Sequence, residues 1–396
     1  MDFKEFLLKY SSIMKILHEN ILKFLENDDD NEGNIEFFIQ YINNHKINQN
    51  KWELKSLLRL ISNISNNHYR SPDFFNKINQ ILKIFKGNII KFFSNYTIFN
   101  IFKSKQRIIL ILLEEKIIQP EYQIFSKMKN GKYKTRHYPE YFYIEFKSFF
   151  SEKLKNEIDF DNIENDENKY KTFLQKRQKG ENDSYICELI RNDSVQEFIS
   201  YINNKNIPFT STIPNSLFET ISIFLKNPPT LIEYAAFYGS IQIFNFLRLN
   251  NVELELSLWS YSIYSHNPEL IHFLEENSDE SSRAVNYEFS YQESIKCHRI
   301  DFMNYFKDNI DQINVNQKNI FKKNIHHYNF IDLNNQIENN LFDVNKYMLP
   351  TMDEMIQYKD INPLSLFAAY DWISVVDFYF KNIEQKMTLI IEWILI

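Results

Sequence analysis

One helix-turn-helix pattern in the second half of the chain constrains the fold more than any other sequence feature. Its clearest copy runs from Thr230 to Leu247 and places Ala235 and Ala236 before a turn at Gly239, after which an apolar helical stripe follows. Small residues let a neighbouring helix approach closely, and the stripe gives the second helix one buried face. The pattern therefore predicts a pair of short antiparallel helices.

Further copies of this pattern can be aligned with it at the positions of Ala236 and Gly239. Ala368 takes the position of Ala236 in the last copy, while His266, His298 and Asp371 take the position of Gly239 in different copies. Recurrence at about 20 to 50 residues is typical of stacked repeats, and helices this short depend on neighbours for stability. The additional copies are Tyr185–Tyr201, Leu258–Leu274, Tyr291–Phe306, the degraded Ile320–Gln336, and Asn362–Phe380.

Composition favours an all-α fold and disfavours several functions. Only 5 of 396 residues are glycine, which argues against glycine-rich phosphate loops and tight hairpins. Hydrophobic residues make up 44% of the chain, enough for a sizeable core, and the many asparagines suit helix caps and turns. The net charge of -7 gives no overall reason to bind nucleic acid or an anionic membrane.

Cysteine usage and apolar runs indicate a soluble intracellular protein. Cys187 and Cys297 are too few for a disulfide framework or a cysteine zinc site. The first residues include two acids where a secretory signal needs a basic stretch, and the apolar runs Ile108–Leu113 and Leu389–Ile396 are too short or too interrupted to span a bilayer. We expect a cytoplasmic location and no membrane span.

The repeats resemble the ankyrin repeat, whose first helix opens with Thr-Pro-Leu-His-x-Ala. Pro363 and Leu364 stand in the family's positions in the last copy. Ala235, Ala236 and Gly239 match the two small residues and the turn in the first clear copy. The resemblance implies a solenoid of stacked helix pairs whose surface binds a protein partner.

The chain departs from the family's usual pattern in three ways. Leu231 replaces proline in the first clear copy, histidines occupy the glycine column in the middle copies, and the spacings of 27 and 32 are shorter than usual. These segments are similar to a diverged ankyrin-like domain of unknown function that is abundant in some flagellate protists. In those proteins a less patterned helical region precedes the domain.

The sequence therefore predicts an N-terminal helical region over residues 1–181 and an ankyrin-like array of about five or six units over 182–386. A linker rich in acid and asparagine is expected near 156–183. The final residues 387–396 are apolar and suggest an incomplete repeat. We expect a monomer unless this apolar end associates. Helices of the first region are predicted at residues 3–26, Asn34–Asn44, Trp52–Ile64, Asp73–Phe85, Gln106–Ile117 and Glu140–Leu154.

A basic loop over residues 127–137 offers the strongest local charge feature. Lys132, Lys134 and Arg136 lie there among aromatic residues, a combination that can bind phosphates or stack on bases. A solvated surface turn at Gly131 explains the same residues, and the domain lacks the high isoelectric point of nucleic-acid binders. Nucleic acid or anionic lipid is therefore the alternative ligand class.

No residue pattern predicts catalysis, a cofactor or a metal site. Cys297 and His298 fall at a predicted turn, where a buried cysteine beside a capping histidine is the simpler interpretation. Trp259 and Trp372 are candidate partner contacts, Trp372 being expected to be the more exposed. The sequence thus predicts a non-enzymatic protein interaction scaffold whose partner is unidentified.

Overall fold

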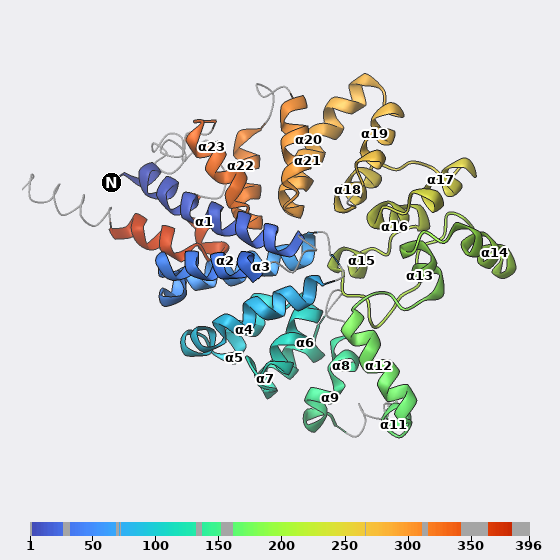
Figure 1. Cartoon of the computed structure of the whole chain (residues 1–396), viewed down its shortest axis with the longest axis horizontal. Coiled ribbons are helices and arrows are strands. Elements are labelled where there is room, and N and C mark those ends of the chain that lie inside the picture. The colour runs from blue at the N-terminus through green and yellow to red at the C-terminus, as the bar shows by residue number, and fades with distance from the viewer. Residues whose placement is uncertain are drawn as a thin grey trace, which may run out of the picture. The chain divides into compact units, whose positions relative to one another are not determined.

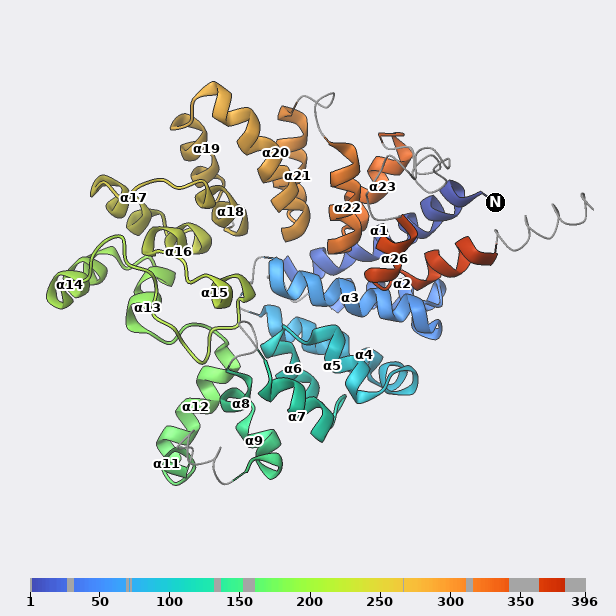
Figure 2. The same cartoon turned by 180° about the vertical axis from the view of Figure 1, so that it is seen from behind.

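A computed structural model describes residues 2–26, 32–68, 71, 73–131, 137–151, 161–265, 267–310, 316–341 and 363–381. Within these ranges the chain is helical, with turns and loops between the helices and one isolated antiparallel bridge between Thr212 and Thr230 (Figures 1 and 2). The prediction of an all-α fold is confirmed for this part of the chain. None of its helices has the combination of length and apolar content needed to cross a membrane.

The contacts divide the chain into two compact units. Unit 1 comprises residues 1–63, 71–77 and 294–396, and unit 2 comprises 64–70 and 78–293. Three helices contain a point of division: α3 (Lys51–Asn67), α4 (Phe74–Phe92) and α20 (Glu280–Cys297). The boundary that the sequence suggests near 156–183 falls inside unit 2, so the contacts do not divide the chain there.

Unit 2 contains a series of helix pairs in its second half. Helix α13 packs on α14, α16 on α17, and α18 on α19, while α16 also contacts both α13 and α18. The helices of this unit are α5 (Asn95–Phe102), α6 (Gln106–Glu114), α7 (Tyr122–Lys129), α8 (Tyr138–Tyr141), α9 (Tyr143–Phe146), the 3₁₀ helix η3 (Lys147–Phe149), α11 (Asp161–Glu164), α12 (Glu167–Lys179), α13 (Tyr185–Arg191), α14 (Val195–Lys205), α15 (Ser222–Lys226), α16 (Leu231–Tyr238), α17 (Ile241–Leu249), α18 (Ser257–Tyr264) and α19 (Pro268–Glu276).

The pair α16 and α17 illustrates how the sequence forms one of these elements. Thr230 and Glu233 form a reciprocal capping box that begins α16, and Gly239 ends it with a φ of 70°. Ala235 and Ala236 have no exposed surface, as expected where neighbouring helices approach closely. The apolar stripe of α17 is also buried, at Ile243, Phe244 and Leu247.

The same turn closes the first helix of five pairs. In each, a residue with left-handed φ donates its N–H to the carbonyl three residues earlier, and the following N–H bonds a carbonyl five residues earlier, which is the Schellman motif. The five turn residues are Asp193, Gly239, His298, Tyr328 and Asp371. Three of these residues, Gly239, His298 and Asp371, stand at the turn positions that the repeated sequence pattern predicts. The fourth predicted position, His266, lies outside the described residues.

Unit 1 brings the first helices of the chain against the last ones. Helix α1 packs on α23 and on α2, and its buried side chains recur at spacings of three and four residues, as at Leu7, Tyr10, Met14 and Leu17. The helices of this unit, besides parts of the shared ones, are α1 (Phe3–Glu26), α2 (Glu32–Asn44), the 3₁₀ helix η1 (Ile47–Gln49), α21 (Ile300–Asn309), α22 (Gln317–His327), α23 (Phe330–Glu338), α26 (Pro363–Ala369) and a helix over residues 373–381.

Most helices predicted in the first region are present, with three differences. The segment Glu140–Leu154 is not one helix, because α8, α9 and η3 break it into short pieces. Residues assigned to a linker form α12, which Asp166 caps through its carboxylate and Gly180 ends with a φ of 67°. The helix predicted to begin at Asn34 begins two residues earlier, as α2 at Glu32.

Candidate interaction site

A groove of about 480 Å³ lies in unit 2, beside the last of its helix pairs. The loop before α18 supplies one wall, the end of α19 a second, and the beginning of α20 a third. Its lining residues are Leu254, Glu255, Leu256, Trp259, Leu274, Asn277, Ser278, Ser282, Val285 and Asn286. Because three consecutive helices contribute, the packing of the pair positions the whole groove.

Trp259 and two aliphatic side chains form the apolar part of this groove. Trp259 is only 3% exposed, and its ring contacts the edge of Tyr287, with ring centroids 6.2 Å apart. Leu256 and Val285, by contrast, are 54% and 68% exposed. Exposed aliphatic side chains around a fixed aromatic floor are typical of a surface that can hold an apolar anchor.

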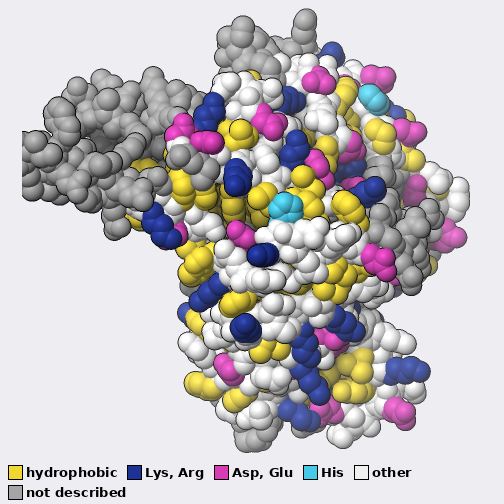
Figure 3. Space-filling view, turned by 60° about the vertical axis from the view of Figure 1, so that its left-hand side comes forward, with side chains coloured by type: hydrophobic (Ala, Val, Ile, Leu, Met, Phe, Trp, Pro, Cys, Tyr) yellow, Lys and Arg dark blue, Asp and Glu magenta, His cyan; other side chains and the backbone are white. Residues whose placement is uncertain are grey.

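The chain around the groove is strongly acidic. Residues 249–292 contain eight acidic residues and one arginine, Arg283, with no lysine. On the molecular face drawn in Figure 3, by comparison, lysine and arginine are intermixed with acidic and apolar side chains. The acidic residues are Glu253, Glu255, Glu269, Glu275, Glu276, Asp279, Glu280 and Glu288.

Two of these acids lie where they do not favour the helix that carries them. Glu275 and Glu276 occupy the last turn of α19, which contains no basic residue. A helix C-terminus carries partial negative charge, so the exposed carboxylate of Glu276 costs about 0.3–1 kcal/mol there. Oε2 of Glu275, by contrast, lies 3.2 Å from Nδ1 of His272. Arg283 compensates in part by donating to the carbonyls of Glu275 and Ser278. The end of α19 is therefore a place where an additional cation would be stabilised.

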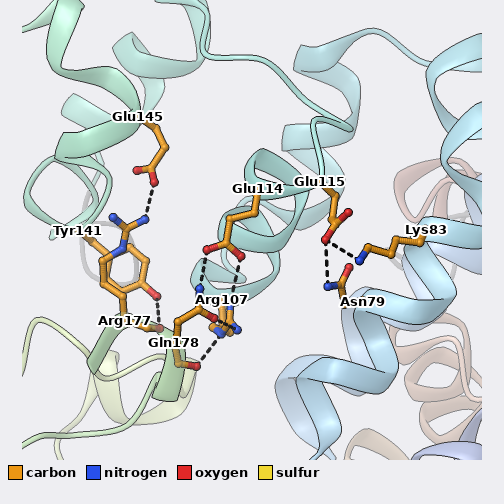
Figure 4. Close-up of polar contacts among 9 residues, drawn as sticks. All are labelled: Asn79, Lys83, Arg107, Glu114, Glu115, Tyr141, Glu145, Arg177 and Gln178. Atoms are coloured by element: carbon orange, nitrogen blue, oxygen red, sulfur yellow. Dashed lines mark hydrogen bonds and ion pairs between the residues drawn. The ribbon is translucent and has the colours of Figure 1, made fainter. Parts of the chain in front are cut away.

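A second polar feature of unit 2 is a buried pair of arginines (Figure 4). Arg177 of α12 donates to Glu145 at 2.7 Å, and its guanidinium lies over the ring of Tyr141. Arg107 of α6 donates through Nε to the carbonyl of Gln178 at 2.8 Å and lies 3.9 Å from a carboxylate oxygen of Glu114. These bonds join α12 to α6 and to the short helices between them.

Burial dominates the electrostatics of this arginine network. It raises the pKa of Tyr141 to about 12 and also raises the pKa of Glu114, although Arg107 lies nearby. It lowers the pKa of Arg107. Each arginine has a carboxylate partner within the unit, so the network holds helices together and is not arranged like a site that receives a charged ligand.

Of the two predicted tryptophan contacts, Trp372 differs from expectation in its exposure. Trp372 has no exposed surface, and its indole Nε1 donates to the carbonyl of Ile325 at 3.2 Å. The expectation that Trp372 is exposed is therefore wrong, because the residue after the left-handed Asp371 points back into the helix pair. Trp259 is buried as well, but its side chain forms the floor of the groove.

The basic loop is described only at its flanks. Lys132, Lys134 and Arg136 lie outside the described residues. Gly131 and His137 line a cavity of about 530 Å³ together with Glu219, which is only 3% exposed. Lys226 also lines this cavity, so its lining carries one acidic and one basic side chain and does not mark a phosphate site.

The remaining candidate residues, Pro363, Leu364 and Ala368, belong to helix α26. Pro363 is the first residue of α26, where its missing N–H costs nothing, and Leu364 follows it. Ala368 is exposed, unlike Ala236 of the equivalent column.

The two cysteines are free and buried, as the sequence suggests. Burial raises the pKa of the Cys187 thiol to about 11, which makes it a poor nucleophile near neutral pH. His298 occupies the turn after Cys297, with a φ of 57°, and its Nδ1 lies 3.0 Å from Nε2 of His18. Among the described residues no group of three or more His, Cys, Asp or Glu side chains is arranged to hold a metal ion.

Comparison of the chain with protein-family models, curated proteins and solved structures finds no match. The acidic stretch around the groove is visible in the sequence as a run without lysine, but only the helix packing shows that Leu256 and Val285 border the same groove as Trp259.

Proposed function

We propose that this protein is a non-enzymatic interaction scaffold built from ankyrin-like stacked repeats. The observation that carries the proposal is the Schellman turn that recurs at equivalent positions in five helix pairs. Repeated pairs bury their apolar faces against neighbours and leave an extended outer surface, which repeat proteins use for binding.

The contacts between successive pairs support this proposal. Asp193, the turn residue of the pair α13 and α14, accepts hydrogen bonds from the N–H groups of Gln242 and Ile243 in α17, both at 3.0 Å. Ser240, at the next turn, donates to the carbonyl of Ile190. At this junction one pair caps a helix of the next, as is expected where helix pairs stack.

Partner capture from a lysate of the source cells tests the scaffold function. With the full chain as bait, we expect a protein recovered in a fixed ratio whose recovery survives nuclease treatment and raised salt. A matched bait carrying Leu247→Asp, which places a charge inside the stack, should recover none of it. Recovery of nucleic acid or lipid alone would contradict the scaffold function and favour the basic loop over residues 127–137.

A further inference from the structure

The groove beside α18 combines an apolar floor with acidic surroundings, and this pairing specifies the chemistry of an occupant. Leu256 and Val285 are the aliphatic side chains that remain exposed at its rim, and Trp259 closes its floor. An apolar side chain that enters between Leu256 and Val285 would be shielded from water by these two side chains and by the ring of Trp259.

The charges near the groove are mostly negative, and the one arginine close to it, Arg283, is bonded to the carbonyls of Glu275 and Ser278. Glu255 lines the groove directly. Glu253, two residues earlier in the sequence, and Glu276, at the adjoining end of α19, are both exposed. Asp279 has a separate role, because its carboxylate accepts from the N–H of Ser282 and caps α20. Acids that are unfavourable for α19 itself are favourable for a cationic partner.

We propose that this groove docks a basic segment of a partner protein that inserts one or two large aliphatic side chains beside Trp259. This inference rests on the proposed scaffold function and adds the chemistry of the partner. Lysine or arginine residues flanking the anchor would lie against Glu255 and the end of α19. An acidic segment would be repelled from the same position.

The first experiment measures binding of a labelled probe to the full chain by fluorescence anisotropy. The probe is a synthetic amphipathic peptide of leucine and lysine, long enough for about three helical turns, and a leucine and glutamate peptide of equal length is its control. The lysine peptide is expected to bind, with an affinity that falls as salt is raised. Equal binding of the two peptides would overturn the proposal.

Surface substitutions then locate the binding site. Leu256→Glu with Val285→Glu should weaken the lysine peptide by about tenfold or more, since both anchor contacts are lost. Glu255→Lys should weaken it by about threefold to tenfold and reduce its salt dependence. Circular dichroism and thermal unfolding are expected to match the unmodified chain, because all three side chains are exposed.

Matched controls place the same chemistry outside the groove. Leu249→Glu alters a side chain that is 72% exposed but does not line the groove, and Glu197→Lys reverses an exposed charge on α14. Both should leave peptide affinity within about twofold of the unmodified chain. If the controls weaken binding as much as the groove variants, the proposed site is wrong.

Two further outcomes separate this inference from the scaffold function. A lysate partner that the groove variants still capture would leave the scaffold function intact and overturn the groove as its docking site. Groove-dependent peptide binding with no protein captured by the unmodified chain would support the site and contradict the scaffold function. A dimer of the unmodified chain that the groove variants dissociate would show a second copy as the occupant, which also overturns the proposal.

Discussion

The left-handed turn residues show how single side chains connect elements of this fold. Four of the five are not glycine, although φ near +55° costs an L-residue about 1–2 kcal/mol. Their side chains make contacts that glycine cannot make. Asp193 caps α17, His298 meets His18, and Asp371 accepts from Lys55 at 2.8 Å and from Arg59. The contacts offset the conformational cost, which explains how a chain with so little glycine forms these turns.

Gly239 is the exception, and its replacement should be costly. It has a φ of 70°, and an added Cβ would lie 3.3 Å from the Cβ of Asn267. We expect Gly239→Ala to lower the free energy of unfolding by about 1–2 kcal/mol, measured by urea denaturation. Gly87→Ala is the matched control, because its added Cβ meets nothing within 4 Å and its position is helical. It should leave stability unchanged or raise it by up to about 1 kcal/mol.

Asp371 predicts a pH-dependent contribution to stability. Although partial burial acts to raise its pKa, hydrogen bonds from Lys55 and Arg59 act more strongly and hold the pKa of Asp371 below its usual value. A carboxylate with a lowered folded-state pKa stabilises the fold above its unfolded pKa of about 3.9 and loses that contribution as the pH falls through the folded value.

We therefore expect Asp371→Asn to cost about 1–2 kcal/mol at neutral pH, since asparagine tolerates the left-handed turn but leaves two cations without their carboxylate. The difference from the unmodified chain should shrink as the pH falls below the usual aspartate range. Asp377→Asn, which removes an exposed pair with Lys381, should change stability by less than about 0.5 kcal/mol. A difference for Asp371→Asn that persists in acid would contradict the ionic explanation.

At the scale of elements, α12 shows how a polar-looking segment becomes an ordered helix. Its buried residues are Phe173 and Arg177, four positions apart on one face. Tyr141 donates to the carbonyl of Arg177 at 3.0 Å, and Thr220 donates to that of Gly180 at 2.6 Å. The helix is therefore attached by polar contacts at its end more than by an apolar stripe.

Removing the arginine of this helix should be severe. We expect Arg177→Ala to lower the free energy of unfolding by about 3–5 kcal/mol, because Glu145 loses its cationic partner and a space opens beside Tyr141. Combining Arg177→Met with Glu145→Gln should cost less than the sum of the two single changes, by about 1–3 kcal/mol in a double-mutant cycle. Additive effects would mean that the ion pair between Arg177 and Glu145 does not couple them.

The elements differ in how far the sequence could predict them. Helix α1 was predictable because its stripe is local, whereas α12 has only two buried side chains and resembles a charged linker in the sequence. The turn columns of the repeats were also predictable from local spacing. The burial of Trp372 was not, since it depends on the carbonyl of Ile325 in another helix. The sequence indicated Trp259 as a contact residue but not the groove around it, because the three walls of the groove meet only through helix packing.

At the scale of the whole molecule, the chain contains a unit assembled from its first and last segments. Phe6 of α1 stacks on Phe378 with ring centroids 3.8 Å apart, and Phe3 meets Tyr379. Ser11 of α1 donates to Asn334 of α23 at 2.9 Å. Helix α1 thus covers aromatic side chains of the helix over residues 373–381 and packs on α23.

A change on α1 should consequently be felt more than 300 residues away in the sequence. Leu17 has no exposed surface, whereas the adjacent Ile16 is 42% exposed. We expect Leu17→Asp to accelerate amide hydrogen exchange in α22 and α23 and to lower the free energy of unfolding by about 3 kcal/mol or more. Ile16→Asp should leave exchange in these helices unchanged. If amide exchange in α22 and α23 is the same in the two variants, α1 does not stabilise these helices.

The packing of α1 on α23 also bears on the order in which the chain can fold during its synthesis. Helix α1 leaves the ribosome before α23, which begins only at Phe330, after all of unit 2 has been made. Unit 2 is free to form during translation, as is usual for a domain completed early. Helix α1 can pack on α2 in the meantime, but the part of its apolar face that packs on α23 must stay in water or be held by a chaperone until α23 is made.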